Sequence, residues 1–213
     1  MVCNVASMST YLVAALAGLL TGAGLIIAIG PQNIYVLRQG VARMHVTPII
    51  AVCAVSDVVL IVAGVAGLGA LVSAHPAVVT IAKIAGGTYI VVLGVLAARR
   101  CLRSDEAIMV SADEATTVSR WTAVGAALAL TWLNPHVYLD TVLTLGAVAN
   151  SHGNAKWAFA IGCCIASIIW FTLLGRGAGR LAPLFATPRA WKMLDAGVAV
   201  IMVAMGAALI VSR

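Results

Sequence analysis

The stretch Thr131-Trp132-Leu133-Asn134-Pro135-His136-Val137-Tyr138-Leu139-Asp140 interrupts a long apolar segment with a proline and several polar residues. Proline lacks a backbone N–H and clashes with the carbonyl four residues earlier, so a helix that reaches Pro135 is expected to break. Asn134 is a favourable N-cap, and proline is favoured at the first position of a helix. The stretch therefore predicts a half-helix that begins at Pro135, inside a membrane-spanning region.

The predicted half-helix would direct its free N–H groups and the positive end of its dipole into the protein, an arrangement by which transporters hold anionic groups. His136 and Asp140 are four residues apart and should share one face. An aspartate at membrane depth costs about 2.5 to 3.5 kcal/mol on insertion scales, which makes Asp140 a functional candidate. Asp140 also follows Asn134 by roughly 9 Å of helix, a spacing that suits a long cationic side chain.

A second proline-containing stretch, Ile29-Gly30-Pro31-Gln32-Asn33-Ile34-Tyr35, is also expected to open a helical segment. Together with Val55-Ser56-Asp57, the two stretches closely resemble the LysE-type family of basic amino-acid exporters, and the likeness extends over nearly the whole chain. The Asn-Pro-His form indicates the lysine/arginine branch over the broader homoserine/threonine exporters. Two residues depart from the family pattern: Ala28 stands where related chains often carry a further proline, and Arg176 puts a charge near the end of the fifth apolar run.

The resemblance implies a secondary exporter of L-lysine and L-arginine in the cell membrane, with no enzymatic activity, catalytic residue, metal or cofactor. The motifs and the resemblance together give the expected substrate-binding residues as Gly30, Pro31, Gln32, Asn33, Asp57, Asn134, Pro135, His136, Tyr138 and Asp140. Asp57, His136 and Asp140 are also the candidates for proton coupling, because ionisable groups inside a membrane normally face a cavity or pathway.

The composition is that of a polytopic membrane protein. Hydrophobic residues make up 62% of the 213 residues and charged residues 9%, whereas charged residues are about a quarter of a soluble domain. Six spans of about 20 residues, with their loops, account for nearly all of the chain. We therefore expect one all-α transmembrane domain over residues 1–213, with no separate soluble domain. The apolar run from Tyr11 is too long for a signal peptide and should remain as a membrane helix.

Six apolar runs are the predicted spans. They are Tyr11 to Leu37, Ile49 to Val72, Ala77 to Ala98, Thr122 to Ala149, Ala158 to Gly175 and Ala196 to Val211. Most lysines and arginines follow the first, third and fifth runs, so the positive-inside rule places the loop 99–120 in the cytoplasm and both termini outside. A re-entrant Gly30-Pro31 segment would change this count and the orientation. The net charge of +6 is explained by the basic residues that orient the protein in the membrane, and no nucleic-acid partner is expected.

The two halves show an internal repeat. An offset of 110 aligns Asp57 with Ser167, and Pro31 matches Pro135 at an offset of 104. Because each half, about 9–98 and 121–213, holds an odd number of spans, the halves should insert in opposite directions. This predicts an inverted 3+3 repeat in which helices one and four are broken and the substrate site lies between the halves.

Several residues have a structural interpretation. Asp57 could pair with Lys83 or a backbone group, and His136 could be a hydrogen-bonded core residue. Trp132, Trp170 and Tyr138 are expected to pack, although the Tyr138 hydroxyl needs a partner at that depth. The glycines Gly64, Gly67 and Gly69 should permit close helix approach. The cysteines Cys3, Cys53, Cys101, Cys163 and Cys164 lack metal-site or disulfide spacing and are expected to be small buried hydrophobes.

Two classes of function remain. The first is a secondary transporter, since the sequence has no G-x-x-x-x-G-K-[ST] phosphate-binding loop. Its substrates are basic amino acids, with neutral amino acids or metal cations as alternatives within the same superfamily. The second class, an intramembrane enzyme with His136 and Asp140 as acid and base, is disfavoured because no nucleophile, metal set or cofactor motif accompanies them. The expected partners are the amino-acid substrate and the lipid bilayer, and a homo-oligomer is left open.

Overall fold

The computed structural model describes residues 2–27, 30–68, 74–102, 119–181, 183, 185 and 187–211, with backbone only at 2–7, 76, 78, 82, 100 and 135. The elements are α1 (Val2–Ile26), α2 (Pro31–Val41), α3 (Val46–Ala63), η1 (Gly64–Leu68), α5 (Pro76–Cys101), α7 (Arg120–Trp132), α8 (Pro135–Val137), η2 (Tyr138–Leu145), α9 (Gly146–Ser151), η3 (Gly153–Ala155), α10 (Lys156–Leu181) and α11 (Pro188–Val211). Every element in this part of the chain is helical, which confirms the all-α prediction.

Five segments are long and apolar enough to cross a membrane, as expected for a multi-pass membrane protein. They are Met8–Ile26, Val46–Leu68, Val79–Arg99, Gly153–Leu181 and Pro188–Val211. The remaining apolar run, Thr122 to Ala149, is divided among α7, α8, η2 and α9. Each of these pieces is shorter than the roughly 20 residues that a single membrane helix needs.

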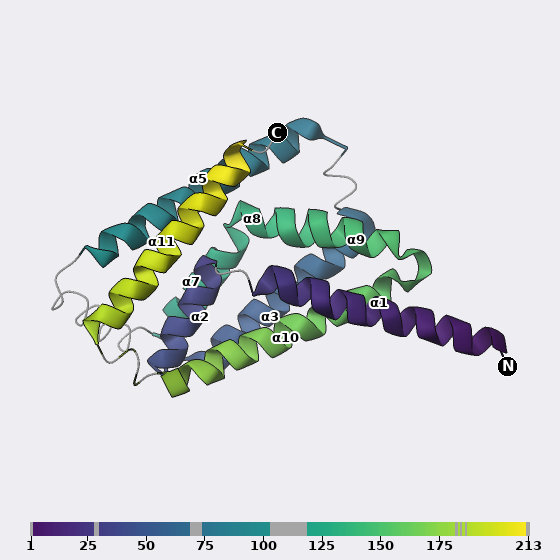
Figure 1. The fold of residues 1–213 in the computed structure, drawn as a ribbon, viewed down its shortest axis with the longest axis horizontal. Helices are drawn as coiled ribbons and strands as arrows, with labels where there is room; N and C mark the ends of the chain where they lie inside the picture. Colours follow the sequence, from purple (N-terminus) through teal and green to yellow (C-terminus); the bar gives the residue numbers. More distant parts are fainter. Residues whose placement is uncertain are drawn as a thin grey trace.

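The helices form two groups with short segments between them (Figure 1). In one group α5 and α11 lie side by side and run in opposite directions, and in the other α1 and α3 pack against α10. The short helix α2 packs on α10, while α7 packs on α3 and α8 packs on α5. The starts of α2 and α8 consequently lie in the interior, between the two groups.

Glycines allow some of these helices to touch through their backbones. A Cβ atom on Gly18 of α1 or Gly162 of α10 would collide with a carbonyl of the other helix. A Cβ on Gly146 would lie 2.6 Å from the Gly64 carbonyl oxygen, so Gly64 also has the expected packing role. Gly67 does not, because the space around it is open and its φ of 108° accounts for the glycine instead. Gly69 lies outside the described residues.

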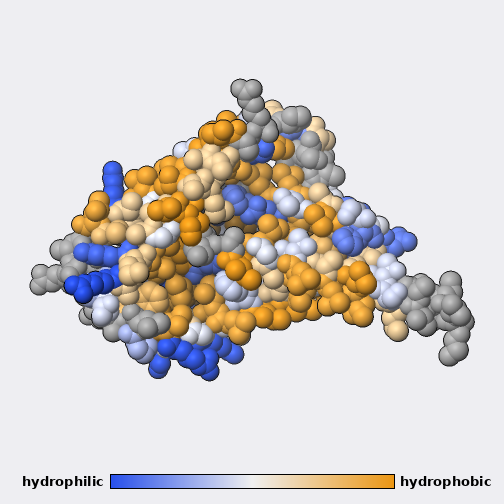
Figure 2. Space-filling model, viewed as in Figure 1, coloured by the Kyte–Doolittle hydropathy of each residue, from blue (hydrophilic) through white to orange (hydrophobic). Residues whose placement is uncertain are grey.

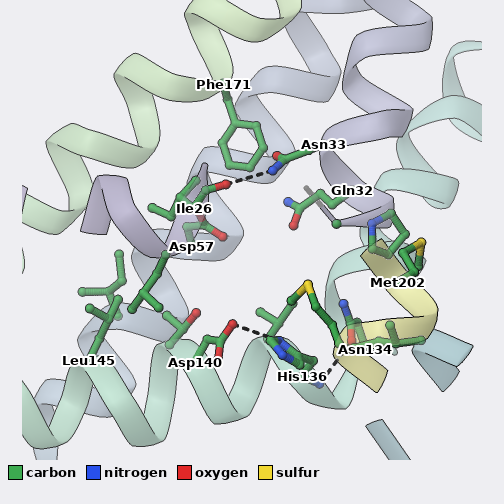
Figure 3. A pocket seen from close by; sticks show the side chains of 18 residues that line it. Ile26, Gln32, Asn33, Asp57, Asn134, His136, Asp140, Leu145, Phe171 and Met202 are labelled. Atoms are coloured by element: carbon green, nitrogen blue, oxygen red, sulfur yellow. Dashed lines mark hydrogen bonds and ion pairs between the residues drawn. The ribbon is translucent and has the colours of Figure 1, made fainter. Parts of the chain in front are cut away.

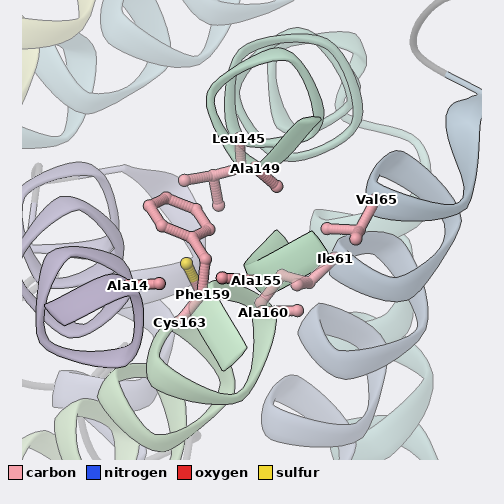
Figure 4. Close-up of a cluster of buried hydrophobic side chains, with 9 residues drawn as sticks. All are labelled: Ala14, Ile61, Val65, Leu145, Ala149, Ala155, Phe159, Ala160 and Cys163. Carbon is pink, nitrogen blue, oxygen red and sulfur yellow. The ribbon is translucent and has the colours of Figure 1, made fainter. Parts of the chain in front are cut away.

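One cluster of the core is built from small groups that surround a large aromatic ring. Phe159 of α10 is fully buried and packs with Ala14 of α1, Ile61 of α3 and Leu145 of η2 (Figure 4). Cys163 belongs to this cluster, and Cys53 is buried in another, which confirms the prediction for these two. The four cysteines among the described side chains are free thiols. Cys3 lies outside the described side chains.

The outer surface is largely apolar. Leu20, Leu173 and Val200 are between 64% and 71% exposed, as side chains that face lipid would be. Hydrophobic residues cover much of the visible face, whereas hydrophilic residues gather toward its left and lower-left edges (Figure 2). At that end α2, α5 and α10 finish and α3, α7 and α11 begin. We refer to it as the basic end, after Arg38, Arg43, Arg99, Arg120, Arg176, Arg180, Arg189 and Lys192, which lie near these helix termini.

Candidate functional site

A central pocket of about 100 Å³ lies where the starts of α2 and α8 meet α3 and α11 (Figure 3). Eight of the ten residues predicted for the substrate site line it, namely Gly30, Pro31, Gln32, Asn33, Asp57, Asn134, His136 and Asp140. Its apolar walls include Ile26, Ile61, Ile90, Leu145, Phe171 and Met202. Residues that are far apart in sequence thus line one pocket that has both polar and apolar walls.

The α2 side of the pocket presents hydrogen-bond donors. Pro31 is the first residue of α2, and Gly30 before it has an extended backbone and no side chain to cap the helix. The first N–H groups of a helix have no partner within the helix, and the dipole there is positive. The Gln32 Nε2 atom is buried without a hydrogen-bond partner among the described residues. Its polar neighbour is the thiol of Cys53, whose sulfur is only a weak acceptor.

Asn33 lines the pocket but uses its amide to hold the chain break in place. Its Nδ2 atom donates a 2.8 Å hydrogen bond to the carbonyl of Ile26, in the last turn of α1. Its Oδ1 atom accepts a 3.2 Å hydrogen bond from the Trp170 indole. The side chain therefore links the end of α1, the start of α2 and α10, and it fixes the direction in which α2 points.

The start of α8 differs from that of α2 because its N–H groups are already paired. Asn134 is buried, and its Oδ1 atom accepts a 3.1 Å hydrogen bond from the backbone N–H of His136. The Asn134 carbonyl accepts a further bond, of 3.2 Å, from the Val137 N–H. Pro135 supplies the first residue of α8. Of the two helix starts at the pocket, α2 is therefore the one without a side-chain cap, and it carries the unpaired Gln32 amide.

Asp140 lies on the opposite wall from Gln32 (Figure 3). Its Oδ2 atom is 2.9 Å from His136 Nδ1, one turn earlier, and its side chain is 35% exposed. The i,i+4 spacing predicted from the sequence thus brings these two side chains into contact. Thr141 and Leu145 continue this wall along η2, a π-helical segment. π-Helical segments inside helices frequently occur at functional sites.

Asp57 is the second carboxylate of the pocket, and it is only 6% exposed. The Ser167 hydroxyl of α10 donates a 2.7 Å hydrogen bond to Asp57 Oδ2. Asp57 pairs with this hydroxyl and not with Lys83, the partner considered from the sequence. A buried carboxylate needs such compensation, because an ionised group in an apolar interior is costly to desolvate.

The aromatic residues near the site have structural roles. The Tyr138 hydroxyl donates a 2.9 Å hydrogen bond to the Trp132 carbonyl across the break, and Tyr138 is absent from the lining of the pocket. The Trp132 indole donates to Ser56 of α3 at 3.0 Å. These two bonds, with that of Trp170, satisfy polar groups at the chain breaks, as expected for packing residues.

Sequence reasoning missed two interactions at or near this site. Ser167 was aligned with Asp57 by the repeat, and that alignment was the available signal for their contact. The second is a 2.6 Å ion pair between Arg38 of α2 and Asp195 of α11. Both residues lie at the ends of apolar runs, where a charge is usually explained by the orientation of the protein in the membrane. No local sequence signal therefore distinguishes Arg38 and Asp195 from the other charges at span ends.

Comparisons with known proteins agree with these observations. A family model described as "LysE type translocator" matches residues 23–213. A candidate amino-acid transporter of Mycobacterium tuberculosis is 44% identical, over 87% of this chain and 91% of the relative. The lysine exporter LysE of Corynebacterium diphtheriae is 36% identical over 92% of this chain and 98% of its own length. The arginine exporter protein ArgO of Pectobacterium carotovorum is 37% identical over 88% and 91%. No solved structure matches the chain.

Proposed function

The chain belongs to the LysE type translocator family, and we propose that it exports L-lysine and L-arginine from the cytoplasm through the central pocket. The observation that carries the proposal is the polarity of this pocket. Donors from α2 lie on one wall, and carboxylates from α3 and η2 lie on the others. A basic amino acid has the complementary arrangement, with a carboxylate at one end and a cation at the other.

The substrate carboxylate binds at the start of α2. The buried Gln32 amide is a donor without a hydrogen-bond partner among the described residues, and no side chain caps the start of α2. A helix N-terminus favours an anion through both its free N–H groups and its dipole. In this proposal α8 contributes less to carboxylate binding, because Asn134 already accepts from its first N–H groups.

The substrate cation binds at Asp140. This carboxylate is partly exposed, and it contacts a histidine, His136, that can give up the contact. A substrate ammonium or guanidinium that replaces His136 at Asp140 would form a charge-assisted hydrogen bond. Asp57, more deeply buried and bound to Ser167, is then suited to carry the coupling proton.

Proton exchange provides the driving force. Moving one positive charge outward against an inside-negative potential costs about 2.3 kcal/mol per 100 mV. Inward movement of one proton for each exported cation removes this electrical cost. Asp57 and Asp140 both line the pocket, so one site can alternate between a bound cation and a bound proton.

We further propose six spans in two inverted halves, with α1–α2 as the first span and α7–α8–η2–α9 as the fourth. The packing supports this arrangement, because α1 and α2 of the first half pack on α10, whereas α7 and η2 of the second half pack on α3. The basic end faces the cytoplasm by the positive-inside rule, and both termini lie outside.

Counterflow in proteoliposomes tests the function. Vesicles loaded with unlabelled L-lysine should accumulate labelled L-lysine and L-arginine, and the labelled compounds should be recovered unchanged. Loading with valine or threonine should give little accumulation. Exchange of neutral amino acids only would contradict the basic substrate, and chemical conversion of the label would indicate an enzyme.

A further inference from the structure

A partly buried ion pair lies outside the central pocket, toward the basic end. Arg38 Nη2 donates to Asp195 Oδ1 at 2.6 Å, and the side chain of Asp195 is only 4% exposed. The Arg38 guanidinium also lies over the ring of Trp191, 5.1 Å from its centroid. The pair joins α2 to α11 across 157 positions of sequence. The proposed binding of substrate in the central pocket does not use these residues.

A second cavity lies beside Arg38 of this ion pair and next to the central pocket. Pro31, Ile34, Tyr35 and Arg38 line it from α2, and Val198 and Met202 line it from α11. The four α2 residues have i, i+3, i+4, i+7 spacing, which places them on one face of the helix. Pro31 and Met202 also line the central pocket, so the two cavities meet at these residues.

The ion pair lies two helical turns from the central pocket. Arg38 follows Pro31 by seven residues, and Asp195 precedes Met202 by seven residues. Seven residues of helix correspond to about 10 Å. The ion pair therefore lies between the basic end and the central pocket.

We propose that Asp195 and Trp191 form an entry site for the ammonium or guanidinium group of the substrate, and that Arg38 occupies this site when no substrate is there. The inference rests on the proposed function. A carboxylate and an aromatic face that contact the same guanidinium suit a substrate guanidinium or ammonium, through a charge-assisted hydrogen bond and a cation–π contact. Replacement of Arg38 by the substrate exchanges one cation for another, so Asp195 is never left as a buried, uncompensated charge.

A purely structural ion pair predicts the opposite effect of one substitution. If Arg38 only fastens α2 to α11, its removal weakens the protein and lowers transport. If Arg38 competes with the substrate for Asp195, its removal leaves the carboxylate to the substrate and lowers the KM. The apparent affinity of the protein for its substrate rises when a state that competes with substrate binding, here the Arg38–Asp195 pair, is removed. The sign of the change in KM therefore distinguishes the two roles.

The experiment measures KM and kcat for L-arginine exchange in proteoliposomes, with substrate offered at the basic end. Arg38→Gln should lower the KM by about threefold or more, as loss of a competing state would. Asp195→Asn should raise the KM by about tenfold, the effect of losing one charged hydrogen bond, with a smaller change in kcat. Arg43→Gln is the matched control, because Arg43 lies at the same end but donates to the Gly179 carbonyl. It should leave the KM unchanged.

A double variant separates binding from folding. Arg38→Gln with Asp195→Asn leaves no lone buried charge, so it should unfold at a temperature close to that of wild type and still show the raised KM. An unchanged or raised KM in Arg38→Gln, or a wild-type KM in the double variant, would overturn the entry site while wild-type exchange proceeds. Absence of exchange by the wild-type protein would overturn the proposed function, and this inference with it.

Discussion

The Ser167 hydroxyl donates a 2.7 Å hydrogen bond to Asp57, and the two residues are 110 positions apart. The same offset aligns the two halves of the sequence. Equivalent residues of an inverted repeat can touch one another only near the axis that relates the halves. The contact therefore supports the proposed inverted repeat, and it puts a buried carboxylate close to the expected axis, where transporters of this kind bind their substrates.

Asp57→Asn should abolish proton-driven export without loss of stability. The amide retains a hydrogen bond to Ser167 but cannot carry the proton, and removal of a buried charge lowers the cost of insertion. Ser167→Ala is the control, since it removes one hydrogen bond and keeps the carboxylate, and it should reduce proton-driven export only in part. Lysine transport driven by a pH gradient in proteoliposomes, at matched protein levels, and thermal unfolding in detergent measure the two effects. Wild-type proton-driven transport by Asp57→Asn would exclude this residue from coupling.

Asp140→Asn should raise the KM for lysine by about tenfold or more, because a charge-assisted bond to the substrate cation is lost. His136→Gln should have a smaller effect, since its side chain only holds Asp140 while the pocket is empty. Norleucine is a neutral analogue of similar length. It should inhibit lysine exchange more strongly in Asp140→Asn than in the wild-type protein. Equal KM values for wild type and Asp140→Asn would place the cation site elsewhere.

Gly146→Ala should destabilise the protein, because its Cβ would lie 2.6 Å from the Gly64 carbonyl oxygen where α9 meets η1. Overpacking of this kind costs about 1 to 3 kcal/mol. Gly125→Ala is the matched control, since nothing lies within 4 Å of its Cβ position in α7. Thermal unfolding in detergent should show a lower transition temperature for Gly146→Ala only. Equal transition temperatures would show that η1 and α9 separate at no cost.

The two ends of α5 test the orientation. Leu102, at the basic end, is 86% exposed, and Ala74, before the other end, is also exposed. After removal of the native cysteines, Ala74→Cys should react with an impermeant thiol reagent in intact cells, and Leu102→Cys should react only with a permeant reagent. The reverse pattern would put the basic end outside and reverse the direction of the proposed export.

Composition, proline placement and the family resemblance predicted an all-helical membrane protein and eight of the residues that line the central pocket. Proline restricts φ and cannot donate, so Pro31 and Pro135 at the first positions of α2 and α8 follow from local chemistry. The π-helical segments η1 and η2 were not predicted, because hydrophobic periodicity carries no signal for a single wider turn. The Arg38–Asp195 pair depends on how α2 and α11 pack, which no pattern within either helix specifies.

The hydrogen bonds that pair the first N–H groups of α8 could also not be predicted from the sequence. Asn134 was correctly expected to be a cap, but a cap consumes the N–H groups that were expected to bind the substrate. Whether a helix start is open or closed depends on the rotamer of one side chain. Gly30, with no side chain, gives α2 no side-chain cap, and for this reason we propose that the substrate carboxylate binds at α2.

The central claim, that one pocket recognises both ends of a basic amino acid, is tested most directly by competition against labelled L-lysine exchange in proteoliposomes. L-lysine amide lacks the carboxylate and norleucine lacks the cation, so both should compete at least about tenfold less well than L-lysine with the wild-type protein. In Gln32→Ala, which removes the buried donor, the advantage of lysine over lysine amide should shrink, whereas its advantage over norleucine should persist. Competition by lysine amide as strong as that by lysine, in the wild-type protein, would contradict the account.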